Sequence, residues 1–170
     1  VGQTVEVGAF RNVASGALHV DGVLSNLNGG YLDFRGGQLS GSGLINGDVF
    51  VGGDATTAIF TPGNSPGTMT IDGEYGQEQN GELELEMAGS QPGQYDVVDA
   101  SGGLTFNEGV IRFETPTFYT GAAGDQLDVD FGDVADTASP MMRPGSNAPR
   151  AHIAGKIALL AMNADGYANL

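Results

Sequence analysis

The sequence contains no cysteine, no tryptophan and only six lysine and arginine residues. The absence of cysteine excludes a disulfide framework and a zinc site built on thiolates, although it does not fix the redox compartment. No apolar run reaches the roughly 18–20 residues that a membrane-spanning helix needs. The longest run, 157–162, is far shorter, so we expect no membrane span. The chain starts at Val1 without a basic and apolar leader, so we expect a processed chain or a fragment.

The shortage of basic residues leaves a strongly acidic chain. Against those six cations stand 21 aspartates and glutamates, which gives a formal net charge of −15. Nucleic acids and anionic membrane surfaces are bound through clustered lysine and arginine, so a chain of this charge is electrostatically opposed to both. We therefore expect no nucleic-acid partner.

Glycine, by contrast, is abundant, with 29 residues among 170. Short alternating segments are bounded by glycine at 16–22, 67–73 and, more loosely, 103–109. Alternation of apolar and polar residues marks a strand with one buried face, and a bounding glycine permits the sharp corner that follows. Recurrence of this unit with little helical periodicity predicts an all-β chain coiled as a parallel β-helix, or β-solenoid.

The pattern divides the chain into two parts that form one continuous structural unit. Over 1–75, apolar runs recur about every ten residues, which predicts solenoid rungs of two strands and about 20 residues each. The proline- and glycine-rich segment 61–67 predicts a tight corner. Over 76–170 we expect a C-terminal β cap of longer, partly antiparallel strands with a loop at about 136–149. The tail is either a hairpin of 159–162 on 167–170, which we favour, or a helix through Ile153, Ile157 and Leu160.

A family resemblance covers about half of the chain. Its motifs occur in order: a glycine-rich segment at 36–49, Ile59 to Tyr75 with its Pro-Gly-Asn-Ser-Pro-Gly turn, the alternating Gly81 to Met87, and 94–98. This order resembles the β-helical repeat regions of exported bacterial surface proteins, namely autotransporter passengers and PEP-CTERM-type exoproteins. The resemblance implies a β-helix that is secreted or held at the cell surface.

The sequence offers few groups for catalysis. Glu82, Glu84 and Glu86 share one face of an alternating strand, where they form either a carboxylate pair for glycoside hydrolysis or a solvated outer face. His19 and His152 have no histidine, cysteine or carboxylate at ligand spacing, and His19 is expected to point to solvent. No residue is therefore assigned a catalytic role, and we expect a protein that is not an enzyme.

One acidic segment suggests a metal. Asp128, Asp130 and Asp133 have the spacing that begins a calcium loop, but Gly132 and Ser139 stand where such a loop needs oxygen ligands. The same segment also fits a strand with an acidic outer face. We therefore expect no cofactor other than weakly bound calcium at these three residues.

These observations predict a non-enzymatic, extracellular structural protein that builds a cell-surface or matrix assembly. The alternative is a β-helix that binds or degrades polysaccharide through one of its faces.

Self-association is a further expectation, because the end of a solenoid leaves backbone groups unpaired. The first strand is expected to meet an apolar C-terminal strand of the next copy, head to tail, and such a contact would produce an open filament. The residues expected in this joint are Val1, Thr4, Val5, Val7, Ile157, Leu159 and Leu160.

Overall fold

The computed structural model describes residues 4–8, 10–26, 30–86, 88 and 93–114, together with the strand backbone of 127–130, 152–153 and 156–159. These residues form strands, turns and bends but no helix. In particular, none of them belongs to a helix that is long and apolar enough to cross a membrane.

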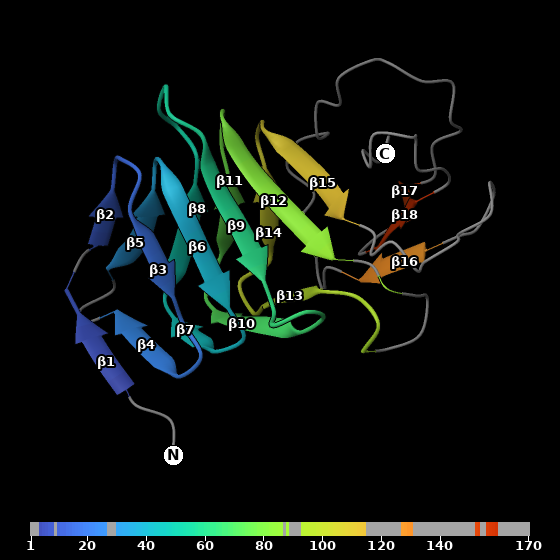
Figure 1. The fold of residues 1–170 in the computed structure, drawn as a ribbon, viewed down its shortest axis with the longest axis horizontal. Coiled ribbons are helices and arrows are strands. Elements are labelled where there is room, and N and C mark those ends of the chain that lie inside the picture. The colour runs from blue at the N-terminus through green and yellow to red at the C-terminus, as the bar shows by residue number, and fades with distance from the viewer. Residues whose placement is uncertain are drawn as a thin grey trace.

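Three parallel sheets of five strands each form a β-solenoid (Figure 1). Sheet A contains β1 (Thr4–Val7), β4 (Val23–Asn26), β7 (Leu44–Asn46), β10 (Thr68–Asp72) and β13 (Val97–Ala100). Sheet B contains β2 (Phe10–Asn12), β5 (Tyr31–Phe34), β8 (Asp48–Val51), β11 (Tyr75–Gln77) and β14 (Leu104–Phe106). Sheet C contains β3 (Ala17–His19), β6 (Gly37–Gly41), β9 (Ala58–Pro62), β12 (Gly81–Glu86) and β15 (Val110–Glu114).

Each coil of the solenoid contributes one strand to every sheet, so equivalent residues stack from coil to coil. In sheet A, one inward column is Val5, Leu24, Ile45, Ile71 and Ala100. The coils lengthen along the axis. Asn46 lies 21 residues after Ser25, its hydrogen-bond partner on the preceding coil, whereas Ser101 lies 29 residues after its partner Asp72.

The prediction of a parallel solenoid is confirmed, but two details of it are wrong. A coil has three strands rather than two, because some apolar runs contain a corner that divides them between two sheets. The parallel array also does not end near residue 75: the strands of 81–86, 97–100, 104–106 and 110–114 pair in parallel with preceding coils. Antiparallel pairing, which was expected for part of 76–170, occurs among the described residues in the strands of 127–130, 152–153 and 156–159. The parallel array therefore extends to Glu114 because the alternating strands keep the same inward register.

The corners depend on close backbone approach at glycine. Gly41, at the end of β6, has a φ of +120°, and a Cβ atom there would lie 2.1 Å from the carbonyl oxygen of Val20 on the preceding coil. Only a residue without a side chain fits such a position. The glycine that ends this strand is therefore required for coil stacking.

The core is a set of apolar columns that runs through the coils. Leu39, Phe60 and Leu83 of sheet C are fully buried and stack in register. One polar pair lies within the core: Tyr75 donates a hydrogen bond of 3.0 Å to Gln77 Oε1. The Gln77 amide nitrogen donates in turn to the backbone carbonyl oxygens of Gly81 and Val110, so the buried polar atoms are satisfied.

A separate antiparallel sheet contains β16 (Leu127–Asp130), β18 (Lys156–Leu159) and β17 (His152–Ile153), in that order. The helical alternative for Ile153 and Ile157 is therefore wrong, since both belong to strands. The hairpin predicted with 167–170 and the loop at 136–149 lie outside the described residues. A capping role for the C-terminal part remains a prediction.

Candidate functional site

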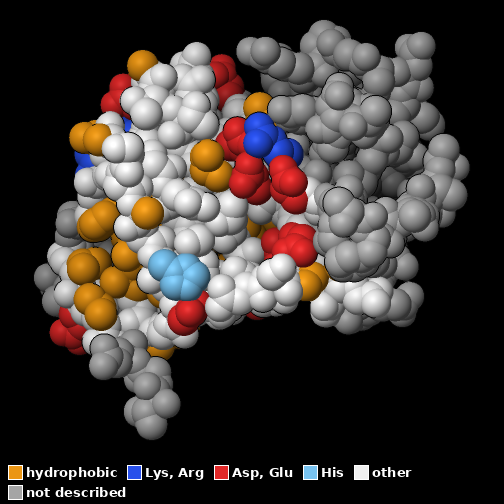
Figure 2. Space-filling view, viewed as in Figure 1, with side chains coloured by type: hydrophobic (Ala, Val, Ile, Leu, Met, Phe, Trp, Pro, Cys, Tyr) orange, Lys and Arg blue, Asp and Glu red, His pale blue; other side chains and the backbone are white. Residues whose placement is uncertain are grey.

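Four of the polar residues that the sequence analysis singled out lie on strands of sheet C, whose outer surface faces the viewer in Figure 2: His19, Glu82, Glu84 and Glu86. Strand pairing aligns His19 with Ser40 and Ser40 with Thr61, and it aligns Glu84 with Arg112. The register that pairs Phe60 with Leu83 continues the first group into the second, so the five residues form one outward column with one residue from each coil. In this view the pale blue of histidine lies beside a red patch nearer the first coils, and a blue patch lies among red ones further along the surface. We call this column the polar column of sheet C.

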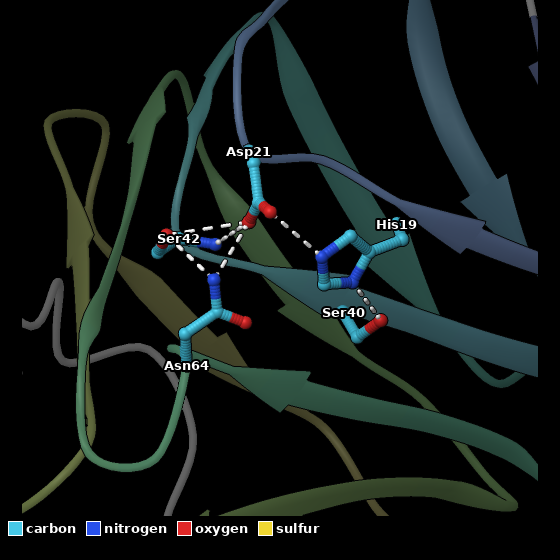
Figure 3. Close-up of polar contacts among 5 residues, drawn as sticks. All are labelled: His19, Asp21, Ser40, Ser42 and Asn64. Carbon is cyan, nitrogen blue, oxygen red and sulfur yellow. Dashed lines mark hydrogen bonds and ion pairs between the residues drawn. The ribbon is translucent and has the colours of Figure 1, made fainter.

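At the first-coil end, five side chains form a hydrogen-bonded cluster (Figure 3). The two ring nitrogens of His19 contact Ser40 Oγ at 2.9 Å and Asp21 Oδ2 at 3.0 Å. The other oxygen of Asp21 accepts hydrogen bonds from the backbone amide and the hydroxyl of Ser42 and from the amide of Asn64. The bond to His19, followed by that from the Ser42 amide, lowers the pKa of the Asp21 carboxyl.

A serine, a histidine and an aspartate in one chain of contacts invite comparison with a nucleophilic triad. A triad also needs N–H donors aimed at a developing oxyanion. Ser40 lies on β6, which is between β3 and β9 and pairs with both. The backbone N–H groups of β6 are therefore used in strand pairing and are not donors to an oxyanion. The side chains of His19 and Asp21 are about half exposed, at 53% and 52%. The arrangement therefore fits a surface bond between coils better than a nucleophile.

Further along the polar column, β12 presents three glutamates. Glu82, Glu84 and Glu86 alternate with buried leucines, as the sequence predicted. Arg112 of the next coil pairs with two of them, at 2.7 Å from Glu82 and 2.9 Å from Glu84. Burial raises the pKa of the Glu84 carboxyl, and the negative charge of Glu82 adds to this rise. The sequence analysis missed Arg112, which lies opposite Glu84 only once the coils are in register.

Beside these glutamates the surface is hollowed, with a volume of about 350 Å³. Its lining residues are Thr61, Pro62, Gly63, Ser65, Glu84, Glu86, Asp96 and Glu114. Burial raises the pKa of the Asp96 carboxyl. The backbone amides of Glu86 and Gly67 donate hydrogen bonds to this carboxylate and favour its charged form, but the effect of burial is larger. Raised carboxyl pKa values in a hollow are a feature of acid–base sites, although structural networks produce them too. We call this hollow the acidic hollow.

The predicted metal site cannot be placed. Asp128 and Asp130 lie on β16, of which only the backbone is described, and Asp133 lies outside the described residues. Within the described part of the chain, no three histidines, aspartates or glutamates are grouped as metal ligands. His152 begins β17, and its side chain is likewise not described.

The residues predicted for self-association fall at two places. Thr4, Val5 and Val7 lie on β1, the edge strand of sheet A, and Val5 is 53% exposed. Ile157 and Leu159 lie on β18, which already pairs with both β16 and β17. Val1 and Leu160 lie outside the described residues. A joint through β18 therefore requires its small sheet to open.

Most members of the cluster in Figure 3 escaped the sequence analysis. Their signal is a spacing of 21 residues, which relates His19 to Ser40 and Asp21 to Ser42. That spacing is the length of one early coil. The sequence pattern predicted this length only as about 20 residues, which is not exact enough to pair individual residues.

Comparisons of this chain with family models, with curated proteins and with solved structures find no match.

Proposed function

We propose that this chain is a non-enzymatic structural solenoid of a bacterial cell surface or extracellular matrix. One observation carries the proposal: outward polar side chains bond chiefly to side chains of a neighbouring coil. These side-chain pairs include His19–Ser40, Asp21–Ser42, Arg11–Asp33, Asn46–Ser25, Ser65–Glu86, Ser101–Asp72, Thr105–Glu74, Asn107–Glu78 and Arg112–Glu84. Groups that a catalyst would present to a substrate are used here to join coils.

Two further features support this role. Solenoid stability is approximately a sum of coil stabilities and of contacts between neighbouring coils, so bonds between coils act directly on the stability of the array. The net charge of −15 keeps such a rod soluble in an open medium. The extracellular setting rests on the resemblance to exported β-helical proteins.

The experiment uses the purified chain in two assays. Under native conditions, thermolysin should spare a fragment that contains 10–114 at concentrations that degrade a denatured control within minutes. The same preparation should release no reducing ends from neutral or acidic polysaccharides over a day. Cleavage of any polysaccharide that the variant Glu84→Gln abolishes would contradict the proposal, because it would place a reaction in the acidic hollow.

A polysaccharide-degrading enzyme is the second candidate, and the acidic hollow is the observation that favours it. Glycoside hydrolysis uses two carboxylates, one of which is kept protonated by a raised pKa, and both Glu84 and Asp96 have raised pKa values. However, Asp96 already accepts two backbone hydrogen bonds, and Glu84 is paired with Arg112. These contacts give both carboxylates structural partners, so the structural proposal is preferred.

Head-to-tail assembly into a filament is part of the structural proposal. The supporting feature is the edge of β1, which pairs with β4 on one side and has no other strand partner among the described residues. An unpaired parallel edge is a template for a strand of another chain.

A further inference from the structure

Sheet B carries a second surface feature, an aromatic pair that takes no part in the hydrogen bonds between coils. Tyr31 of β5 and Phe50 of β8 point outward and meet edge to face, with ring centroids 5.7 Å apart. Tyr31 is 43% exposed, and it is the one aromatic residue among the exposed large hydrophobic residues of the described part of the chain. The Phe50 ring lies across Gly76 of the next coil, where a Cβ atom would come within 2.5 Å of Phe50 Cδ1. The missing side chain at Gly76 therefore makes room for a flat aromatic surface across three coils.

Charged groups adjoin this aromatic surface. Asp33 is buried, and its carboxylate accepts hydrogen bonds from Arg11 Nε at 2.7 Å and from Arg35 Nε at 2.9 Å. The hydrogen bonds that Arg35 donates to Asp33, together with the negative charge of that carboxylate, raise the pKa of the Arg35 guanidinium. Each arginine uses Nε on Asp33, which fixes the plane of its guanidinium and leaves the terminal nitrogens as oriented donors. One of these donors, Arg35 Nη1, makes a long bond of 3.4 Å to the Gly53 carbonyl oxygen.

Between the rings and the arginine lies a hollow of about 380 Å³. Its lining comprises Tyr31, Asp33, Arg35, Phe50, Glu78 and the glycines at 52–53. Apolar faces, planar donors and carboxylate acceptors thus converge on one open space, which is the composition of a small-molecule or sugar site. The lining holds one arginine, Arg35, and two carboxylates, Asp33 and Glu78, so the hollow has no excess of positive charge for an anionic ligand.

We propose that this hollow binds an uncharged sugar polymer, with a hexopyranose ring stacked on Tyr31. A pyranose has an apolar C–H face that packs on an aromatic ring, and hydroxyl groups at its rim that need both donors and acceptors. Arg35 supplies the donors and Glu78 supplies an acceptor. The hollow opens on the flat wall of a sheet, so a chain of sugars can extend past it. The Tyr31 ring makes none of the hydrogen bonds between coils, whereas two carboxylates of the hollow do: Asp33 accepts one from Arg11, and one oxygen of Glu78 accepts one from Asn107.

Affinity electrophoresis of the purified chain tests the proposal. The probes are a soluble β-glucan, a xyloglucan and a galactomannan as neutral polymers, with a polyuronate and a polyglucosamine as charged ones. The wild-type chain should be retarded by at least one neutral polymer. Tyr31→Ala should weaken that binding by about tenfold or more, since a stacked aromatic ring is a typical centre of binding energy. Tyr31→Phe should keep the binding, because the ring is retained.

His19→Ala is the matched control, because it changes an exposed ring on sheet C and should leave the retardation unchanged. Circular dichroism should give the same β spectrum for all variants, since Tyr31 and His19 are both largely on the surface. Three results would overturn the proposal: no retardation by any neutral polymer, retardation by the charged polymers alone, or equal retardation of the wild-type chain and Tyr31→Ala.

Discussion

The side-chain amide of Asn64 donates a hydrogen bond of 3.0 Å to the carboxylate of Asp21, which precedes it by 43 residues. The two residues follow β3 and β9, so this bond joins the first coil to the third. Ser42, at the same corner of the second coil, binds the same carboxylate oxygen. A single aspartate thus joins three successive coils along one corner of the solenoid.

Loss of this carboxylate should weaken the first coils. We expect Asp21→Ala to lower the urea midpoint of unfolding, because it removes the partner of His19, Ser42 and Asn64 together. Asp99→Ala is the control: Asp99 is also exposed, on β13, and its side chain has no bond to another described residue. Circular dichroism in urea measures both midpoints. Equal midpoints for the two variants would show that the corner bonds add no stability.

The raised pKa of Glu84 predicts a pH dependence with a definite sign. An acid whose pKa is higher in the folded state binds its proton more tightly there than in the unfolded state. The contribution of Glu84 to stability therefore falls as the pH rises from its ordinary pKa of 4.5 through the raised pKa of the folded chain. Glu84→Gln removes this titration. We therefore expect the stability of Glu84→Gln relative to the wild-type chain to increase from about pH 4 to pH 7, measured by urea unfolding. A constant difference across this range would mean that burial does not raise this pKa.

The buried tyrosine gives a prediction about the core. Tyr75→Phe removes the donor to Gln77 Oε1 and leaves that oxygen buried without it. The expected loss is about 1–2 kcal/mol in the free energy of unfolding, since an unsatisfied buried acceptor keeps its desolvation penalty. Tyr31→Phe removes an exposed hydroxyl and should change this free energy by less than about 0.5 kcal/mol. Similar losses for both variants would argue against the buried bond.

Assembly through the first coil can be tested at its edge strand. Val5 and Val13 are about equally exposed, at 53% and 54%, but only Val5 belongs to a strand. If copies join along β1, Val5→Lys should shift the chain towards monomer in sedimentation velocity, because a lysine on an edge opposes strand addition. Val13→Lys adds the same charge to the same coil and should leave the distribution as in the wild-type chain. A wild-type chain that is monomeric at all concentrations would contradict the filament.

The strand pattern was readable from the sequence, whereas the number of strands in a coil was not. The glycine-bounded units at 16–22, 67–73 and 103–109 correctly mark strands, but β3, β10 and β14 lie on three different sheets. A repeat of this kind describes one side of a coil and carries no information about how many sides the coil has. The coil length also changes along the axis, which removes a fixed period from the sequence.

The candidate sites depended even more on the coil register. Glu84 was noticed because its strand alternates strictly, but its partner Arg112 lies 28 residues away. In the sequence, Phe50 is simply an aromatic residue, and Gly76 is an ordinary strand glycine. Their relationship becomes visible only when the coil register places them side by side. Without an exact coil length, neither pair can be recognised.

A double-mutant cycle on Asp21 and Asn64 tests the claim that outer polar side chains join the coils. The four proteins are the wild-type chain, Asp21→Ala, Asn64→Ala and the double variant, each unfolded in urea. Only a correctly stacked first and third coil brings these residues together, so the account predicts that the double variant loses clearly less stability than the sum of the two single losses. Strictly additive losses would contradict it.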